Sequence, residues 1–274
     1  MPPSWPSASI PRRKVQRTIA PSIYPGGQEA LIEAVAKANP KTVVTVTSGG
    51  AYATDRWLGK VPALLQNWYP GQEGGQAIAE VLFGDRAPEG KLPIRFERRF
   101  ADNPVHDFYD APAHPPGTNP TVKYGEGVFL GYRWYTSNPG KAQPLYAFGY
   151  GLTYTSFRFA NLKLSTAQAH AGDSVTVDVD VTNTGSRDGA DVVQVYVGDP
   201  SAKIARPAKE LKAFEKVRLA PGQTRHVSLT LDRRAFAYYD VARHDWRIDS
   251  GAFKVYVGDA SDHTPLTADL TFGN

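Results

Sequence analysis

The amino-acid sequence predicts an α/β layer followed by an all-β, fibronectin type III-like or immunoglobulin-like sandwich. Between residues 28 and 100, segments with helical apolar spacing alternate with short β-branched runs, which is typical of an α/β layer with a parallel sheet. From about residue 160, short strands with alternating polar and apolar residues follow one another at the spacing typical of a sandwich. At 274 residues the chain is long enough for two compact domains.

Residues 1–27 form an irregular N-terminal segment in this interpretation. Prolines recur there without helical or strand periodicity, and no apolar run is long enough for a signal peptide or a membrane helix, so the compartment stays undetermined. Four basic residues in this segment account for the whole formal charge of +4, namely Arg12, Arg13, Lys14 and Arg17. We therefore expect no nucleic-acid partner and no membrane partner. The absence of cysteine excludes disulfides and thiolate metal sites.

Residues 28–121 are predicted to form the α/β part. The segment from Gln28 places apolar residues on one helical stripe, which Asn39-Pro40 ends; the stripe is Leu31, Ile32, Val35 and Ala36. A strand is expected over 42–47 and another over 63–69, before the Pro70-Gly71 turn. A second helix from about Glu73 to Phe83 and a strand over 91–96 follow, and 97–121 looks like a long surface excursion.

Residues 122–159 contain many aromatic rings among glycines, which indicates a connector pressed against a large surface. Residues 160–274 are predicted to form the sandwich. Valines at every second position of 174–183 predict a strand with one buried face, the valines being Val175, Val177, Val179 and Val181. Further strands are expected over 191–198, 212–219, 225–231 and 252–258.

Four long motifs carry a family resemblance. They are WYPGQEGGQAIAEVLFGDRAPEGKLP (68–93), GYRWY (131–135), PLYAFGYGLTYTSF (144–157) and RPAKELKAFEKVRLAPGQT (206–224). Together they resemble the C-terminal half of the β-glucosidases of glycoside hydrolase family 3. The resemblance implies that 28–100 is the end of the family's α/β sandwich domain and that 160–274 is its fibronectin type III-like domain.

The resemblance also implies a retaining glycosidase that acts on terminal β-glucosides without a cofactor. One carboxylate attacks the anomeric carbon, and a second protonates the leaving oxygen. In the family the nucleophile is an Asp on an N-terminal barrel, and the acid/base is a Glu shortly before the helix that here begins near Gln28. Residues 1–28 contain neither Asp nor Glu. We therefore expect this chain to be inactive alone, as a part of an enzyme of the bacterial cytoplasm or periplasm.

Two carboxylates are candidates for an activity of the chain's own: Asp55 in YATDRW and Glu73 in PGQEGG. The structural interpretation is favoured for both, because Glu73 suits the first turn of a helix and Asp55 suits a surface ion pair with Arg56. Trp68, Tyr69 and Trp134 could stack on a sugar face, although such rings more often serve as packing anchors. The six histidines show no metal-ligand spacing, so no metal is expected.

Two alternatives remain beside the inactive part of a β-glucosidase. The chain could be an autonomous small glycosidase that uses Glu73 or Asp55, or it could be a carbohydrate-binding or interaction module. We also expect self-association, because a face that packs against the rest of the enzyme would be exposed.

Overall fold

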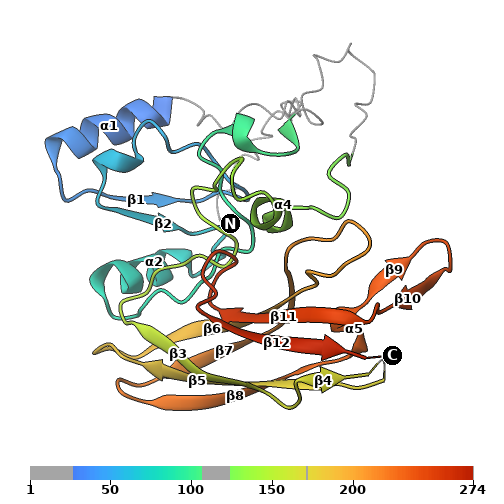
Figure 1. The fold of residues 1–274 in the computed structure, drawn as a ribbon. Coiled ribbons are helices and arrows are strands. Elements are labelled where there is room, and N and C mark those ends of the chain that lie inside the picture. The colour runs from blue at the N-terminus through green and yellow to red at the C-terminus, as the bar shows by residue number, and fades with distance from the viewer. Residues whose placement is uncertain (1–26, 107–123, 171, 274) are drawn as a thin grey trace, which may run out of the picture.

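The computed structural model describes residues 27–106, 124–170 and 172–273. In Figure 1 the α/β part lies above a two-sheet β-sandwich, and the connector that contains α4 (Tyr132–Ser137) runs between them. The predicted irregular segment 1–27 falls almost wholly outside the described residues, as does most of the predicted excursion over 97–121. The fold class is the predicted one, an α/β part followed by an all-β sandwich.

Helix α1 (Gln28–Ala38) begins after Gly27 and ends where the Asn39 N–H donates to Val35 O. The predicted stripe is only half correct. Ala36 is buried and Ile32 packs on the core, whereas Leu31 is 63% exposed and Val35 is 43% exposed. Residues at i and i+1 of a helix lie about 100° apart, so the four-residue stripe covers two faces, and only one of them meets the sheet.

The sheet of the α/β part consists of β1 (Val43–Val46) and β2 (Ala63–Gln66), which pair in parallel. The short turn η2 (Leu58–Lys60) lies in the crossover between them. Helix α2 (Gly74–Phe83) follows and stops at Gly84, whose φ of 83° closes the helix in the left-handed conformation. Strand β2 is three residues shorter than predicted, since regular pairing stops before Asn67.

The predicted strand over 91–96 is wrong. This segment pairs with the connector: Gly149 N–H donates to Leu92 O, and Phe96 N–H donates to Tyr146 O. Only Phe96 forms a β-bridge, with Tyr146. Pro93 carries no N–H and therefore cannot donate a hydrogen bond in a regular β-ladder. The turn η3 (Phe100–Asp102) follows, and this part of the described chain ends at residue 106.

The sandwich contains a five-stranded and a three-stranded sheet. The larger sheet has the order β4-β12-β11-β6-β7, with bounds Gln168–Ala169, Leu266–Phe272, Gly251–Gly258, Gly189–Gly198 and Glu210–Leu219. The smaller sheet has the order β3-β5-β8, with bounds Phe157–Leu164, Val175–Asn183 and Thr224–Leu231. Its first strand thus begins three residues before the expected boundary at 160.

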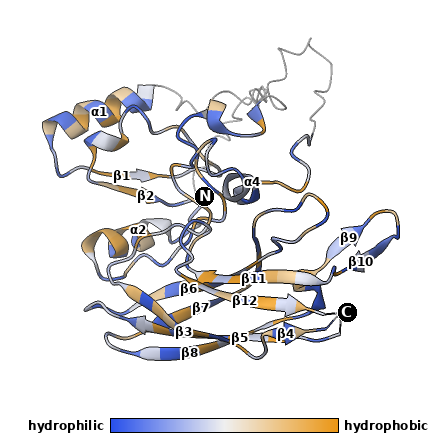
Figure 2. Ribbon diagram, viewed as in Figure 1, coloured by the Kyte–Doolittle hydropathy of each residue, from blue (hydrophilic) through white to orange (hydrophobic). Residues whose placement is uncertain are grey.

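The core of the sandwich is buried between its two sheets. The four valines predicted to face inward on β5 are all 0% exposed, and they pack with Phe236, Phe253 and Phe272 from other elements. Strand β6 is buried along almost its whole length, because the connector covers its second face. Figure 2 shows hydrophobic residues on the strands of this core and also along α2.

The elements between β8 and β11 were not predicted from the sequence. Helix α5 (Arg233–Phe236) is capped by the Asp232 side chain, which accepts from Ala235 N–H. The hairpin of β9 (Tyr238–Asp240) and β10 (Asp245–Arg247) then projects from the sandwich beside it (Figure 1). Three-residue strands carry too little alternation to be recognised from the sequence.

The two parts are joined by polar and aromatic contacts. Lys91 Nζ lies 2.8 Å from Asp191 Oδ1 and 3.1 Å from Gly151 O, which connects the α/β part, the connector and β6. Burial raises the pKa of Asp191, although the Lys91 ammonium opposes that rise. On the connector, the Tyr132 hydroxyl accepts from Leu211 N–H at 2.7 Å, and its ring stacks on Phe148. The connector thus contacts the sandwich through Tyr132, which also meets Tyr196 of β6 edge-on.

Candidate functional site

The carboxyl ends of β1 and β2 are the first candidate for a functional site. The strands are parallel and Val46 pairs with Gln66, so the loops that follow them leave the same edge of the sheet. In open α/β sheets ligands bind at this edge, where loops and not packed strands face the solvent. The two loops contain Ser48, Gly49 and Gly50 after β1 and Asn67, Trp68 and Tyr69 after β2.

Hydrogen bonds from Gln66 hold the two loops together. Tyr52 donates through its hydroxyl to Gln66 Oε1 at 2.8 Å, and Gln66 Nε2 donates to Ser48 O at 3.1 Å. Burial raises the pKa of Tyr52, which keeps this phenol protonated and able to donate. The end of β2 is therefore tied to the loop that follows β1.

Trp68 has a left-handed backbone with a φ of 55°. Bulky residues rarely adopt this conformation, and strained residues tend to persist at functional positions or where packing fixes them. The Trp68 ring is half-buried and meets Phe96 edge-on, with centroids 6.3 Å apart. The Trp68 ring thus packs against Phe96 at the edge of the sheet.

Tyr69 follows Trp68 and presents its ring to solvent, with 78% of the residue exposed. The ring lies over Gly49, where an added Cβ would come within 2.7 Å of the Tyr69 hydroxyl oxygen. Such a contact is shorter than carbon and oxygen tolerate, so this placement of the ring requires glycine at position 49. An exposed flat ring beside two backbone loops can contact the apolar face of a sugar.

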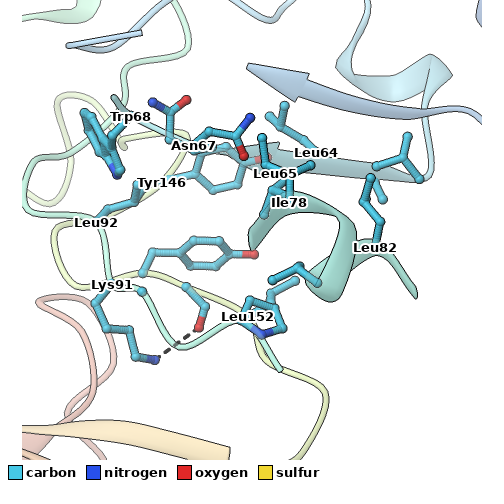
Figure 3. Close-up of a pocket in the computed structure, with 18 of the residues that line it drawn as sticks. Leu64, Leu65, Asn67, Trp68, Ile78, Leu82, Lys91, Leu92, Tyr146 and Leu152 are labelled. Atoms are coloured by element: carbon cyan, nitrogen blue, oxygen red, sulfur yellow. Dashed lines mark hydrogen bonds between the residues drawn. The ribbon is translucent and has the colours of Figure 1, made fainter. Parts of the chain in front are cut away.

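A cavity of about 650 Å³ opens beneath this edge, between β2, α2 and the connector. Figure 3 shows its lining: Leu64, Leu65, Ile78, Leu82 and Leu152 supply aliphatic walls, and Asn67, Trp68 and Tyr146 lie at one end. Lys91 is at the opposite side, where it donates to the Gly151 carbonyl. The volume is within the range of ligand pockets, and the lining is mainly apolar, as such pockets usually are.

The two candidate carboxylates do not meet in this cavity, since neither Asp55 nor Glu73 is among its lining residues. Both are exposed. Glu73 lies one residue before α2, at its N-cap, and its side chain makes no capping hydrogen bond. The expected ion pair of Asp55 with Arg56 is not formed, because Arg56 instead reaches Glu29 on α1 at 3.4 Å.

The three aromatic candidates are split between two places. Trp68 and Tyr69 lie at the edge of the sheet, whereas Trp134 lies on α4 and lines a second pocket with Glu126, Phe129 and Arg206. Sequence reasoning missed Glu126 in this pocket and Lys91 at the junction. In the sequence, Glu126 stands shortly before the GYRWY motif and Lys91 is the first residue of KLP. Neither position tells which residues the side chain contacts.

Within the described residues, no group of three or more His, Asp or Glu side chains is placed to hold a metal ion. The same part of the chain contains no helix that is long and apolar enough to cross a membrane.

Residues 20–154 match the glycosyl hydrolase family 3 C-terminal domain, and residues 191–261 match the fibronectin type III-like domain. The chain is 48% identical to a β-glucosidase of Rhizobium radiobacter over 233 residues, which are 85% of this chain and 28% of that protein. It is 44% identical to β-glucosidase B of Emericella nidulans over 85% of this chain and 28% of that protein.

A solved β-glucosidase of Kluyveromyces marxianus in complex with glucose superimposes with a TM-score of 0.82 at 36% identity, over 93% of this chain and 29% of that one. A family 3 β-glucosidase of Bifidobacterium adolescentis gives a TM-score of 0.81 at 37% identity, over 89% of this chain and 35% of that one. The chain therefore spans about a third of the length of the relatives it matches.

Proposed function

Because this chain belongs to the C-terminal part of glycoside hydrolase family 3, we propose that it serves in the hydrolysis of terminal β-glucosides as one part of a longer catalytic unit. The observation that carries the proposal is the 48% identity to a β-glucosidase over 85% of this chain, which corresponds to only 28% of that protein. The remaining length of the relatives is where we assign the reacting carboxylates.

The chemistry supports this assignment. A retaining glycosidase needs two carboxyl groups about 5–5.5 Å apart on either side of the scissile bond. One of them must act as an acid, which requires a carboxyl group in an apolar or like-charged surrounding. Asp55 and Glu73 are both exposed to water and neither lines the cavity, so neither meets that requirement. The autonomous glycosidase is therefore the weaker alternative.

This chain contributes the carboxyl edge of β1 and β2 to the substrate site in our proposal. The exposed Tyr69 ring would contact the sugar, and Trp68 would hold the loop in place through its left-handed backbone. Parallel-sheet edges are where ligands bind in open α/β folds, which supports this placement. The β-glucoside substrate would lie between this edge and the part of the enzyme that carries the carboxylates.

We also propose that copies of this chain associate with one another. Strands β1 and β2 have no further partner strand among the described residues, and apolar side chains are exposed around them. These are Leu31 and Val35 on α1, Val43 on β1 and Phe83 at the end of α2, exposed by 63%, 43%, 44% and 86%. Exposed apolar surface beside open strand edges favours association between copies.

A chimera tests the proposed hydrolysis. The part of the Rhizobium radiobacter enzyme that precedes its matched region would be fused to this chain from residue 20, where the family match begins. We expect the fusion to hydrolyse nitrophenyl β-glucoside and the same fusion with Tyr69→Ala to show a raised KM. A matched Tyr239→Ala fusion, with the change in the projecting hairpin, should keep its KM. A folded fusion without turnover would contradict the proposal.

A further inference from the structure

The C-terminal end of α2 is held by side chains that lie far away in the sequence. The last carbonyl groups of a helix have no partner within the helix, so other groups must satisfy them. Arg187, in the turn between β5 and β6, donates through Nη1 to Gly84 O at 2.9 Å. Tyr154, on the connector, donates through its hydroxyl to Val81 O at 2.8 Å. In Figure 1, α2 lies between the β1–β2 sheet and the sandwich, which brings these groups together.

The charge of Arg187 also suits this end of the helix. A helix dipole favours a cation near the last carbonyl groups, and α2 has no basic residue of its own in its last turn. The guanidinium can come close because Gly84 has no side chain: an added Cβ would lie 3.2 Å from Arg187 Nη1. The sandwich therefore supplies the cation that α2 lacks.

The turn that carries Arg187 is fixed by one buried amide. Asn183, at the end of β5, donates through Nδ2 to the carbonyl oxygens of Arg187 and Leu219, at 2.8 and 2.9 Å. Its Oδ1 accepts from Gly185 N–H at 3.0 Å and from the Thr155 hydroxyl at 2.6 Å. Every hydrogen-bonding position of the amide is thus used, which holds the turn and the connector in one arrangement.

The opposite end of α2 lies against the sheet-edge loop. The N-cap residue Glu73 makes no capping hydrogen bond, so this end depends on packing. Pro70 directly follows Tyr69, and its ring packs on the buried first residue of the helix, where a Cβ added to Gly74 would come within 2.6 Å of Pro70 Cγ. Close-packed groups transmit displacements, so a shift of α2 moves Pro70 and with it Tyr69.

We propose that the sandwich positions the sheet edge for the substrate, with Arg187 and Tyr154 as positioning residues that act through α2 on Tyr69. The inference rests on the proposed function, in which the Tyr69 ring contacts the sugar. Neither positioning residue touches the substrate. When their end of α2 is released, the helix shifts along the wall of the cavity, and the Tyr69 ring leaves its place over Gly49.

Amide hydrogen exchange of the full 274-residue chain tests whether the hold on α2 reaches both of its ends. Arg187→Ala and Tyr154→Phe should each accelerate exchange within α2 by about threefold, and the double variant by about tenfold, as expected when ordinary hydrogen bonds are lost. The acceleration should include Ala77 N–H, which donates to Glu73 O in the first turn. Faster exchange that is confined to the last turn would overturn the proposal.

The Hα resonances of Gly49 report the Tyr69 ring, because the ring lies over that glycine. They should shift in Arg187→Ala, and Arg187→Lys should restore most of the original shift, since lysine keeps a cation and a donor. A general loss of stability would not produce this pattern. Unchanged Gly49 resonances in the double variant would overturn the proposal.

The matched control is Arg218→Ala. Arg218 is also an arginine of the sandwich that reaches the α/β part, but its partner is Glu89, which lies beyond the end of α2. Exchange within α2 and the Gly49 resonances should stay unchanged in this variant. Equal effects of Arg218→Ala and Arg187→Ala would show that any contact between the two parts suffices, which would overturn the role of Arg187.

The fusion with the Rhizobium radiobacter segment adds the functional result. Arg187→Ala should raise its KM for nitrophenyl β-glucoside by about twofold or more, because a ring in place for a fraction of the time lowers the apparent affinity by that fraction. Arg218→Ala should keep the KM. An unchanged KM for Arg187→Ala in an active fusion would overturn the positioning role. A fusion without turnover would contradict the proposed hydrolysis, whereas the exchange rates and the Gly49 resonances would still decide whether the sandwich positions the sheet edge.

Discussion

The sandwich and the α/β part of this chain differ in how completely they bury their apolar residues. In the sandwich, two sheets enclose a core in which Val175 to Val181 are 0% exposed at every second position. In the α/β part, two parallel strands stand alone, and α1 leaves Leu31 and Val35 in solvent. Parallel sheets are normally covered on both faces. The sandwich therefore buries its own core, whereas the α/β part leaves apolar surface exposed for packing or binding.

Phenylalanine truncation in each part tests this difference most strongly. Phe253 is 1% exposed and packs against Phe236 and Phe272, so Phe253→Ala should lower the free energy of unfolding by about 4 kcal/mol through the cavity it leaves. Phe83→Ala removes the same ring where it is 86% exposed, and should change stability by about 0.5 kcal/mol or less. Urea unfolding measures both. Equal losses would remove the distinction between the two parts.

The buried ion pair at the junction should rank second. Lys91→Met leaves Asp191 buried without its cation, and we expect a loss of about 3 kcal/mol. The exposed pair of Lys60 with Glu33 is the control, and Lys60→Met should cost about 0.5 kcal/mol or less. Differential scanning calorimetry compares the two variants, and similar melting temperatures would show that the junction pair contributes nothing.

The pH dependence of the Lys91→Met variant sharpens the same test. Burial raises the pKa of Asp191 in the folded chain, and removing the Lys91 ammonium raises that pKa further. The folded state then binds this proton more tightly than the unfolded state does, so the unfolding free energy falls as pH rises from the ordinary carboxyl pKa to the raised one. The destabilisation by Lys91→Met should therefore be smaller in acid. A loss that does not vary with pH would contradict this account of the pair.

Substitution of two neighbouring glycines at the sheet edge should have a smaller effect on stability. Gly49→Ala places a Cβ about where the Tyr69 ring lies, which should displace the ring and cost about 1 kcal/mol. Gly50→Ala meets nothing within 4 Å and should be nearly neutral. Chemical shifts of the Tyr69 ring report the displacement directly. An unmoved ring in Gly49→Ala would show that the ring does not depend on the glycine.

The smallest effect is expected on the outer face of the sandwich. His226 Nδ1 lies 2.8 Å from Asp180 Oδ1 on the neighbouring strand, and this hydrogen bond raises the pKa of His226. The stabilisation is present in full below the ordinary histidine pKa and is lost as pH rises through the raised value. Asp180→Asn should lower the His226 pKa, which NMR titration measures. The chemical shifts of the β9–β10 hairpin backbone should stay unchanged by this substitution in the same spectra.

Regular alternation made much of the fold predictable. The valines of β5 define their buried face in the sequence itself, because a strand places every second side chain on the same side. The segment 91–96 misled prediction because its apolar residues suit a strand, whereas Pro93 and the connector decide its pairing. The exposure of Leu31 and Val35 was equally hidden, since periodicity identifies an apolar face but does not say what covers it.

The candidate sites were predictable only in part. Trp68, Tyr69 and Trp134 were selected by residue type, but nothing in the sequence separates the sheet edge from the pocket beside α4. Glu126 becomes notable only when its Oε2 is seen buried without a donor. Such a property depends on contacts between distant segments, which one sequence does not contain.

Turnover of nitrophenyl β-glucoside by the purified 274-residue chain, without any fusion partner, tests the central claim most directly. The account predicts a rate no higher than that of material purified in the same way from cells without the gene. Saturable turnover that persists through repeated purification, and that Glu73→Gln or Asp55→Asn abolishes, would contradict it.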